Sequence, residues 1–484
     1  MASPRLGSIQ IEGERVTQAI PYAYPKMGRV KHIHFVGIGG AGMCGIAEVL
    51  HQEGYQVSGS DVSDNKAIQH LRDRGVTVYI GHDAKHIEHS DVVVRSTAIS
   101  DHNPEIEAAL LKKIPVIPRA MMLAELMRFR HGIAVAGTHG KTTTTSLITS
   151  VLQEGELDPT FVIGGKLTSC GANAQFGSSN YLVAEADESD ASFLFLKPMM
   201  AVVTNIDADH MSTYHGSFAK LRQTFVEFLH HLPFYGLAVV CIDDAEVRHI
   251  LSKIQRPVRS YGFSKDAQYR AIDWKQEALL SSFTVIRPAP HAPLAVKLKW
   301  PGRHNVQNAL AAIVIATELE VSDAAIVKGL YDFQGVGRRF QMLGEKDFDH
   351  GKAMVVDDYG HHPQEIRATV DAFRAVWPDK RLIHVFQPHR YSRTQDLFSQ
   401  FVDVLRLGDE VLLLDIYSAG EAPITGVTSE LLANAIESKG GSVTLVSAQT
   451  LQPELNRVIR EGDVILMQGA GTISQYAHQL MQKS

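Results

Sequence analysis

Apolar and polar positions alternate along the first part of the chain in a way that is typical of strands followed by helices. Short β-branched segments at 32–36, 55–58 and 91–95 are separated by polar stretches, and the segment 43–52 has the spacing of an amphipathic helix. Buried strands that alternate with helices predict a parallel sheet covered by helices. We therefore predict one α/β unit between residue 31 and about residue 119.

The same pattern is repeated twice after Pro115 and Pro118 punctuate the chain. At roughly 100–200 residues per domain, 484 residues suffice for about three domains. The predicted fold class is α/β, with three consecutive α/β domains at 1–120, 121–336 and 337–484. The further predicted strands are 133–136, 182–185, 200–204, 237–242, 353–356, 381–386, 410–414 and 463–467, and the further predicted helices are 120–129, 142–153 and 306–319.

Composition and charge exclude several classes of protein. Apolar residues make up 45% and charged residues 21% of the chain, as in ordinary globular proteins. The formal net charge of -6 argues against a nucleic-acid-binding protein, which would carry a basic surface. Cys44, Cys170 and Cys241 form no C-x-x-C pair, so neither a disulfide framework nor a cysteine zinc site is expected, and a reducing cytoplasm fits.

The chain also lacks the apolar segments that would insert into a membrane. No apolar run reaches the roughly 18 residues of a transmembrane helix. Residues 1–28 are polar and contain no apolar signal core, and we interpret them as a loosely ordered extension. We therefore expect a cytoplasmic protein without membrane insertion.

A first glycine turn, Gly37-Ile-Gly-Gly-Ala-Gly42, matches G-x-G-x-x-G directly after a predicted strand. The glycines allow a tight turn and a close approach of a diphosphate to the amides of a helix N-terminus. Asp61 ends the next strand and is placed to accept a ribose hydroxyl. Because this pattern specifies a diphosphate and not a base, three alternatives stay open here. They are the dinucleotide of an NAD-dependent oxidoreductase, a UDP-sugar, and no ligand.

A second glycine turn, Gly137-Thr-His-Gly-Lys-Thr142, is a more specific pattern. It follows a predicted strand and opens a predicted helix, so its amides can cradle phosphate oxygens. Lys141 would meet the β- and γ-phosphates, and the Thr142 hydroxyl can bind Mg²⁺. The spacing is two residues shorter than in the usual loop. The context still predicts an ATP site.

Polar residues that follow later strands are candidates for the rest of this site. Glu185 and His210 can each ligate Mg²⁺, although a solvated acidic loop and a turn residue are equally good interpretations. Asn305 and Asn308 share a helix face, where amides can bind an adenine edge or serve at a helix start.

Two clusters in the last third of the chain carry histidine, tyrosine and arginine. The first spans 357–363, and the second spans 387–393. Arginines at the ends of strands suit bidentate binding of a carboxylate or phosphate. Zinc binding by His361 and His362 is a weaker alternative, because adjacent histidines rarely converge on one ion.

Taken together, these motifs resemble those of the Mur ligase family. They are F-V-G-I-G-G-A-G-M at 35–43, G-T-H-G-K-T-T-T at 137–144, D-H-M at 209–211, G-R-H-N at 302–305 and D-Y-G-H-H-P at 358–363. Their order matches the family over nearly the whole chain from about residue 29. The details look most like the branch that adds alanine.

The resemblance implies an ATP-dependent ligase that joins L-alanine to the lactyl carboxylate of UDP-N-acetylmuramate in peptidoglycan synthesis, with ATP and Mg²⁺ as cofactors. It implies a Rossmann-like UDP-sugar domain, a central P-loop domain and a Rossmann-like amino-acid domain. The implied UDP-sugar residues are Gly39, Gly40, Asp61, Ser96 and Thr97, and the implied ATP residues are Gly137, Thr138, His139, Gly140, Lys141, Thr142, Thr143, Asn305, Asn308, Arg339 and Asp358. The implied metal ligands are Thr142, Glu185 and His210, the implied amino-acid residues are Tyr359, His361, Arg390 and Arg393, and the implied catalytic residues are Lys141, His361 and Arg390.

Several expectations follow from the resemblance. Some family members carry a carbamylated lysine after the metal-binding histidine, but here the region reads Arg222-Gln-Thr-Phe-Val226, with Lys220 too early. A carbamate ligand is therefore not expected, which fits the alanine-adding branch. Because the three sites lie on three domains, we expect an open free form and a compact ternary form. We separately expect a monomer or weak homodimer. The rivals are a murein-tripeptide ligase, an NAD-dependent oxidoreductase and a non-catalytic nucleotide-binding regulator.

Overall fold

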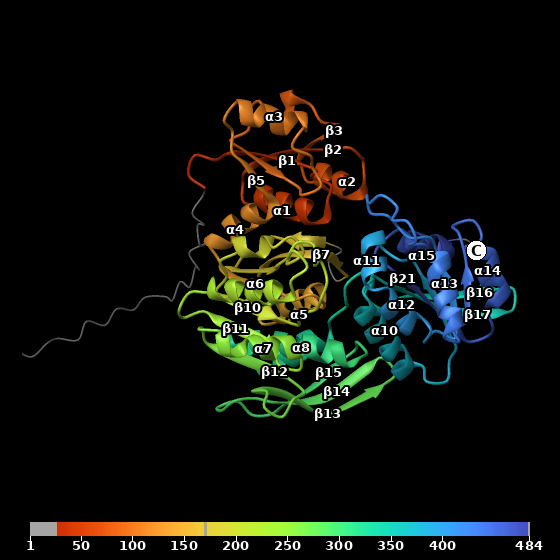
Figure 1. The fold of residues 1–484 in the computed structure, drawn as a ribbon. Helices are drawn as coiled ribbons and strands as arrows, with labels where there is room; N and C mark the ends of the chain where they lie inside the picture. The colour runs from red at the N-terminus through yellow and green to blue at the C-terminus, as the bar shows by residue number, and fades with distance from the viewer. Residues whose placement is uncertain (1–26, 169–171, 483–484) are drawn as a thin grey trace, which may run out of the picture.

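The computed structural model describes residues 27–168 and 172–482, which form three α/β domains in sequence order (Figure 1). Each domain is built on its own sheet, and the sheets have five, ten and six strands. The α/β class predicted from the sequence is confirmed. Cys170 and nearly all of the predicted N-terminal extension lie outside the described residues. Within the described ranges, no helix is long and apolar enough to span a bilayer.

The first domain has a fully parallel sheet. Its elements are β1 (His32–Val36), α1 (Ala41–Gln52), β2 (Gln56–Asp61), α2 (Lys66–Asp73), β3 (Thr77–Ile80), η1 (Ala84–Ile87), β4 (Val92–Arg95), α3 (Pro104–Leu111), β5 (Val116–Pro118) and α4 (Arg119–Arg128). The strand order is β3-β2-β1-β4-β5, so the chain changes direction across the sheet between β1 and β4. Ligands bind at such a switch point in open α/β sheets. The first glycine turn follows β1 and lies there.

The central domain has a mixed sheet. Its elements are β6 (His131–Ala136), α5 (Lys141–Glu154), β7 (Thr160–Leu167), β8 (Ala172–Gln175), β9 (Tyr181–Glu185), η2 (Ser192–Phe195), β10 (Met200–Val203), α6 (Phe218–His230), β11 (Leu237–Cys241), α7 (Ala245–Ile250), η3 (Leu251–Lys253), β12 (Val258–Gly262), β13 (Tyr269–Glu277), β14 (Leu280–Ile286), β15 (Leu294–Leu298), α8 (Arg303–Glu318) and α9 (Asp323–Tyr331). The order is β15-β14-β13-β12-β11-β10-β6-β9-β7-β8. At the edges of this sheet β14 pairs antiparallel with β13 and β15, and β8 pairs antiparallel with β7, which the strand pattern had not predicted. The short connection between β13 and β14 permits only a hairpin.

The third domain repeats the parallel pattern with one antiparallel edge. Its elements are β16 (Gln341–Phe348), β17 (Gly351–Asp358), α10 (Pro363–Val376), β18 (Leu382–Phe386), α11 (Tyr391–Asp396), α12 (Phe398–Leu405), β19 (Glu410–Leu413), α13 (Ser429–Ser438), β20 (Val443–Leu445), α14 (Leu451–Val458), β21 (Asp463–Gln468) and α15 (Ile473–Gln482). The order is β16-β17-β21-β18-β19-β20, and only β16 is antiparallel. The ends of β17 and β18, which carry the two polar clusters, are therefore separated by β21.

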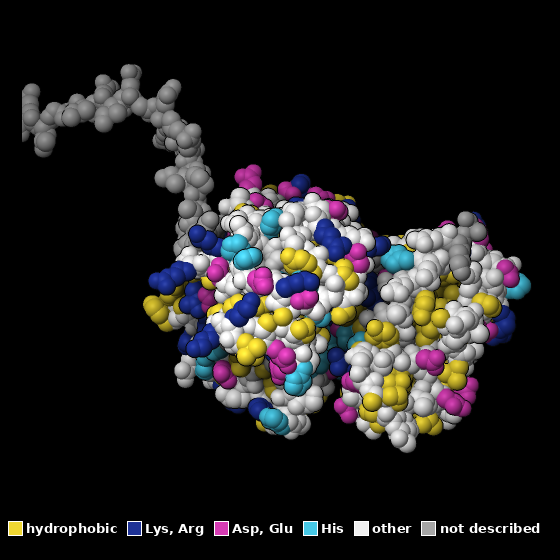
Figure 2. Space-filling view, turned by 90° about the horizontal axis from the view of Figure 1, so that it is seen from above, with side chains coloured by type: hydrophobic (Ala, Val, Ile, Leu, Met, Phe, Trp, Pro, Cys, Tyr) yellow, Lys and Arg dark blue, Asp and Glu magenta, His cyan; other side chains and the backbone are white. Residues whose placement is uncertain are grey.

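The domains are joined in two different ways. One apolar core runs continuously from the first domain into the central domain, where α1 packs on β7 and β8. The third domain has its own cores on the two faces of its sheet, and of the described residues of the central domain, Leu279 and Trp300 are the apolar ones that pack against them. Figure 2 shows a cleft between the two resulting lobes, with Lys and Arg side chains on its walls.

Candidate active site

Two neighbouring cavities lie between the central and third domains, where strands of both sheets end. The larger has a volume of about 800 Å³ and the smaller about 290 Å³. The larger one collects these predicted residues: Thr138, His139, Gly140, Lys141, Thr142, Glu185, His210, Arg339, Tyr359, His361, Arg390 and Arg393. The smaller one adds Thr143, Asn305, Asn308 and Asp358 and shares His139, Gly140 and Arg339. The fold therefore brings 16 of the 22 candidate residues, 12 in the larger cavity and 4 more in the smaller one, into one continuous region.

The second glycine turn connects β6 to α5 at the base of the larger cavity. Gly137 has φ 131° and Gly140 has φ 82°, a left-handed conformation that favours glycine. A Cβ on Gly137 would lie 2.0 Å from Thr204 Oγ1, and one on Gly140 would lie 2.8 Å from Asn308 Oδ1. Glycine is required at both positions, because any side chain would push the loop away from β10 and α8.

Lys141 is the cation of this loop. Its Nζ donates to Gly137 O at 2.6 Å and to both oxygens of buried Glu188, at 3.0 and 2.8 Å. Burial works to lower the pKa of Lys141, but the carboxylates of Glu188 and Asp187 outweigh it and raise the pKa overall. Lys141 is therefore a fixed positive charge at the mouth of a phosphate-binding loop.

Three predicted metal ligands face the same cavity. Glu185 ends β9, and its Oε1 accepts from Gly164 N at 2.8 Å. Burial raises the pKa of Glu185 although Lys141 opposes this, and the Thr142 hydroxyl is among its hydrogen-bonding partners. His210 follows β10 with φ 53°, and burial lowers its pKa, which leaves a neutral imidazole. A carboxylate, a hydroxyl and a neutral imidazole form a donor set that fits Mg²⁺.

The residues predicted near adenine line the smaller cavity but also hold the fold together. Asn308 Oδ1 accepts from Thr144 Oγ1 at 3.1 Å, and its amide donates to Asn305 Oδ1 at 3.4 Å. Asp358 Oδ2 accepts from Phe340 N at 2.9 Å, and its Oδ1 accepts from Gly360 N at 2.9 Å. The Asp358 carboxylate is thus satisfied by protein donors and organises the start of the third domain.

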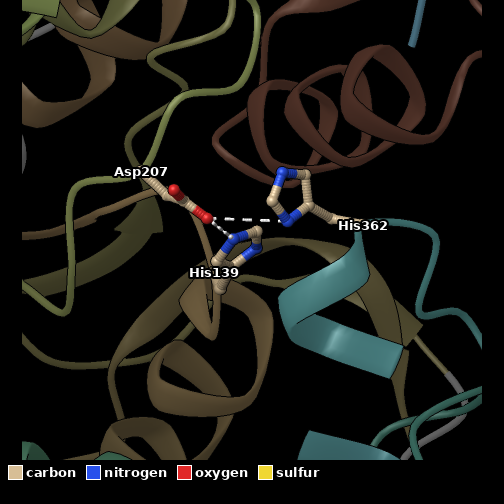
Figure 3. A group of neighbouring side chains, drawn as sticks. All are labelled: His139, Asp207 and His362. Atoms are coloured by element: carbon tan, nitrogen blue, oxygen red, sulfur yellow. Dashed lines mark hydrogen bonds and ion pairs between the residues drawn. The ribbon is translucent and has the colours of Figure 1, made fainter. Parts of the chain in front are cut away.

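A cluster of His139, Asp207 and His362 spans the boundary between the two domains (Figure 3). His139 Nε2 lies 3.1 Å and His362 Nδ1 lies 3.5 Å from Asp207 Oδ2. His139 also meets a second carboxylate, with Nδ1 at 3.3 Å from Glu365 Oε1. Burial works to lower the pKa of His139, but the hydrogen bonds to Asp207 and Glu365 raise it to about 9. His139 is therefore an imidazolium between two carboxylates.

The predicted amino-acid residues form the third-domain wall of the larger cavity. Arg393 donates to Asp209 Oδ2 at 3.1 Å across the domain boundary, and Arg390 pairs with Glu421 at 3.2 Å. The guanidinium of Arg339 lies 5.0 Å from the ring of Tyr359. Both arginines predicted to bind a carboxylate therefore already face protein carboxylates, and a bound amino acid would share or displace them.

The five predicted UDP-sugar residues lie apart from these cavities, on the first domain. Gly39 and Gly40 follow β1, and Ser96 and Thr97 follow its neighbour β4 at the switch point of the sheet. Asp61 Oδ2 accepts from Gly39 N at 2.9 Å, so this carboxylate supports the glycine turn itself.

Sequence reasoning did not single out four residues that the structure brings to the site. Glu188 and Asp209 stand beside predicted ligands, but the pattern did not reveal their partners. Arg119 lies at the start of α4, 3.5 Å from Asp187. It also borders a small cavity, with Gly42 and Lys141, that leads from the first domain to the second glycine turn. Glu365 could have been found as the acidic residue of a capping box that starts at His362.

Comparison with protein families assigns all three domains consistently. The model of the Mur ligase family, catalytic domain, matches residues 32–131. The Mur ligase middle domain matches residues 135–316, and the Mur ligase, glutamate ligase domain matches residues 338–471.

Individual relatives agree with this assignment. The UDP-N-acetylmuramate--L-alanine ligases of Legionella pneumophila strains Corby and Paris are each 68% identical over 458 residues, 95% of this chain and 98% of theirs. The crystal structure of UDP-N-acetylmuramate-alanine ligase MurC from Thermotoga maritima has a TM-score of 0.78 at 29% identity, and covers 93% of this chain and 98% of that one. A murein peptide ligase from Psychrobacter arcticus shares the fold, with a TM-score of 0.69 at 24% identity over 93% of this chain and 98% of that one.

Proposed function

The chain belongs to the Mur ligase family, and on that premise we propose that it is an ATP-dependent ligase that joins L-alanine to the lactyl carboxylate of UDP-N-acetylmuramate in peptidoglycan synthesis. The observation that carries this proposal is the 68% identity, over 95% of the chain, to ligases named for this reaction. The nicotinamide alternative is set aside, because it leaves the second glycine turn without a role. We place the reaction in the cytoplasm, where ATP is available.

We propose that the central domain binds ATP with Mg²⁺. The amides of the 137–143 loop would hold the phosphates, and Asn305, Asn308 and Arg339 would border the nucleoside. Thr142, Glu185 and His210 would hold Mg²⁺, because their oxygen and imidazole donors face one cavity. The ion would supply positive charge that neutralises the phosphates. Lys141 adds a second positive charge there.

The first domain would hold the UDP-sugar at its switch point, with Gly39, Gly40, Asp61, Ser96 and Thr97. A diphosphate at the first glycine turn would leave the sugar directed toward the small cavity at Arg119 and Lys141. This arrangement would bring the lactyl carboxylate toward the γ-phosphate. On the other side of the phosphates, Tyr359, His361, Arg390 and Arg393 would receive alanine.

The residues of this site suit a two-step acyl transfer. The lactyl carboxylate attacks the γ-phosphorus of ATP, ADP leaves, and an acyl phosphate forms while Lys141 neutralises charge. The alanine amine then attacks the acyl carbon, and the tetrahedral intermediate collapses with release of phosphate. Arg390 and Arg393 would anchor the alanine carboxylate, and His361 would accept a proton from the amine.

The test is phosphate release from Mg-ATP and UDP-N-acetylmuramate with either L-alanine or the tripeptide L-Ala-γ-D-Glu-meso-diaminopimelate. We expect release that requires both the UDP-sugar and alanine. Release with the tripeptide as acceptor but not with alanine would indicate a murein-tripeptide ligase. Absence of release with both acceptors would contradict the proposed reaction.

A further inference from the structure

The ring of His361 has two acceptors on one side. Its Nδ1 lies 3.1 Å from the carbonyl oxygen of Tyr359 and 3.4 Å from Glu365 Oε2. Neither oxygen can donate a hydrogen bond once Glu365 is ionised, so Nδ1 must carry the ring proton. The hydrogen bond that the His361 ring makes with a described residue is on Nδ1 and not on Nε2, and His361 lines the larger cavity. The neutral ring therefore keeps its lone pair on Nε2, the atom left for a ligand.

Glu365 is held in place by a set of contacts on both oxygens. Oε2 accepts from the backbone amides of His361 at 3.0 Å and His362 at 3.3 Å. Oε1 faces His139 Nδ1 at 3.3 Å and Arg339 Nη1 at 3.8 Å. The side chain is 12% exposed, so this carboxylate is fixed by two backbone donors and two cations.

Burial and charge act in opposite directions on His361 and Glu365. Burial lowers the pKa of His361 to about 3 despite the neighbouring Glu365 and Asp209 carboxylates, with Arg393 and His389 acting in the same direction as burial. Burial works to raise the pKa of Glu365, yet that pKa lies well below its ordinary value. His361 is the neighbour that lowers the Glu365 pKa most, followed by His139 and Arg339. When the His361 ring is neutral, His139 and Arg339 remain as the cations beside the carboxylate.

From this geometry we propose that Glu365 is a positioning residue for alanine addition, which fixes the His361 ring so that Nε2 faces the alanine amine as a proton acceptor. The inference rests on the proposed function. As the C–N bond forms and the bond from the acyl carbon to the phosphate oxygen breaks, the nitrogen loses one proton to Nε2. The proton on Nδ1 stays hydrogen-bonded to the Tyr359 carbonyl, and the Glu365 carboxylate, 3.4 Å from Nδ1, stabilises the imidazolium that forms by its charge.

Glu365 also joins the two half-sites. His139 belongs to the phosphate loop, Arg339 borders the nucleotide cavity, and His361 borders the amino-acid side. Arg339 lies in the same domain as Glu365, so the carboxylate that fixes His361 gains the His139 cation only when the third domain lies against the central one. Glu365 thus links the position of the phosphate loop to the orientation of the His361 ring.

The neighbouring group of His139, Asp207 and His362 does not carry a metal-site proposal. His139 already uses both ring nitrogens on carboxylates, and His362 Nδ1 caps α10 by accepting from Gln364 N at 3.4 Å. A metal ion would have to displace a ring proton of His139 and the hydrogen bond by which His362 caps α10. The hydrogen bonds and ion pairs of these residues therefore account for the cluster.

The test is a double-mutant cycle in the full-length enzyme, using Glu365→Ala, His361→Gln and the double variant. We expect Glu365→Ala to lower kcat for alanine-dependent phosphate release by about 10- to 100-fold in the native background. In the His361→Gln background, the same substitution should change kcat little. The matched control is Asp207→Asn, which removes the other carboxylate from His139 without touching His361 and should lower kcat less.

Each outcome decides the matter. Equal losses on Glu365→Ala in both backgrounds would show a structural role and overturn the inference, as would an unchanged kcat. An equal loss of kcat with Asp207→Asn would show that the effect of Glu365→Ala arises from His139. That result would also overturn the inference. A native enzyme without alanine-dependent turnover would instead contradict the proposed function. Glu365→Gln, which keeps an acceptor oxygen but no charge, should retain more activity than Glu365→Ala.

Discussion

The two interfaces of the central domain are built from different kinds of contact. Toward the first domain, α1 packs on β7 and β8 within a continuous apolar core, and a Cβ on Gly45 would lie only 2.9 Å from Ala174 Cβ. Toward the third domain, the main contacts are ionic: Arg393 with Asp209, and His139 with Glu365.

This difference indicates which boundary is fixed and which can open. Separating an apolar interface exposes hydrocarbon to water at a cost that grows with area. Separating ion pairs returns charged groups to water, which solvates them well. We therefore expect the first and central domains to move as one lobe and the third domain to close on it. The candidate site residues lie at the boundary that we expect to open.

The largest expected effect is on chemistry at this polar boundary. Lys141→Ala should lower kcat for phosphate release by about 100- to 1000-fold, because it removes the cation of the phosphate loop. The measurement is steady-state phosphate release with saturating alanine. Lys220→Ala, on the exposed surface of α6, is the matched control and should be unchanged. A modest loss for Lys141→Ala would remove this residue from the mechanism.

A bulky side chain at the apolar boundary should reduce stability. Gly45→Val would overpack α1 against Ala174, at a cost of about 1–3 kcal/mol. Thermal unfolding should show a lower Tm, with a smaller decrease for Gly45→Ala, which adds only the Cβ. Equal Tm values for the native protein and Gly45→Val would contradict close packing between α1 and Ala174 at this interface.

Breaking an ion pair at the polar boundary should change the overall dimensions of the protein more than its thermal stability. Asp209→Asn removes the partner of Arg393, and the freed guanidinium can be hydrated by opening of the third domain. Small-angle scattering with nucleotide and UDP-sugar should then show a larger radius of gyration than for the native protein. A decrease in Tm as large as that of Gly45→Val, without a change in shape, would contradict the comparison.

The smallest expected effect is on pH dependence. The His139 pKa is raised to about 9, so its stabilisation of the closed boundary is complete below the unfolded value near 6.5 and is lost as the pH rises through about 9. Scattering between pH 7 and 10 should show gradual opening, and His139→Gln should remove this dependence. If the domains instead opened as the pH fell from 7 to 6, the result would contradict this prediction.

The sequence by itself determined the local features of the site. Glycines at 137 and 140, a lysine at 141 and the helix after them predict a phosphate-binding turn, because each constraint acts within a few residues. The strands predicted at 32–36, 133–136 and 381–386 from their apolar runs correspond to β1, β6 and β18. Motif order was sufficient to indicate the family, which the family models confirmed.

Only the tertiary structure decided which distant residues meet. His139 and Glu365 are 226 positions apart, and Asp209 and Arg393 are 184 apart. No local pattern encodes such pairs, because they depend on how one sheet is oriented against another. The antiparallel edges of the central sheet escaped prediction for a similar reason, since alternation fixes the faces of a strand and not its neighbour. Spacing along the chain therefore specified the local turns, strands and helices. Domain packing placed the carboxylate of Glu365 between the phosphate loop and His361.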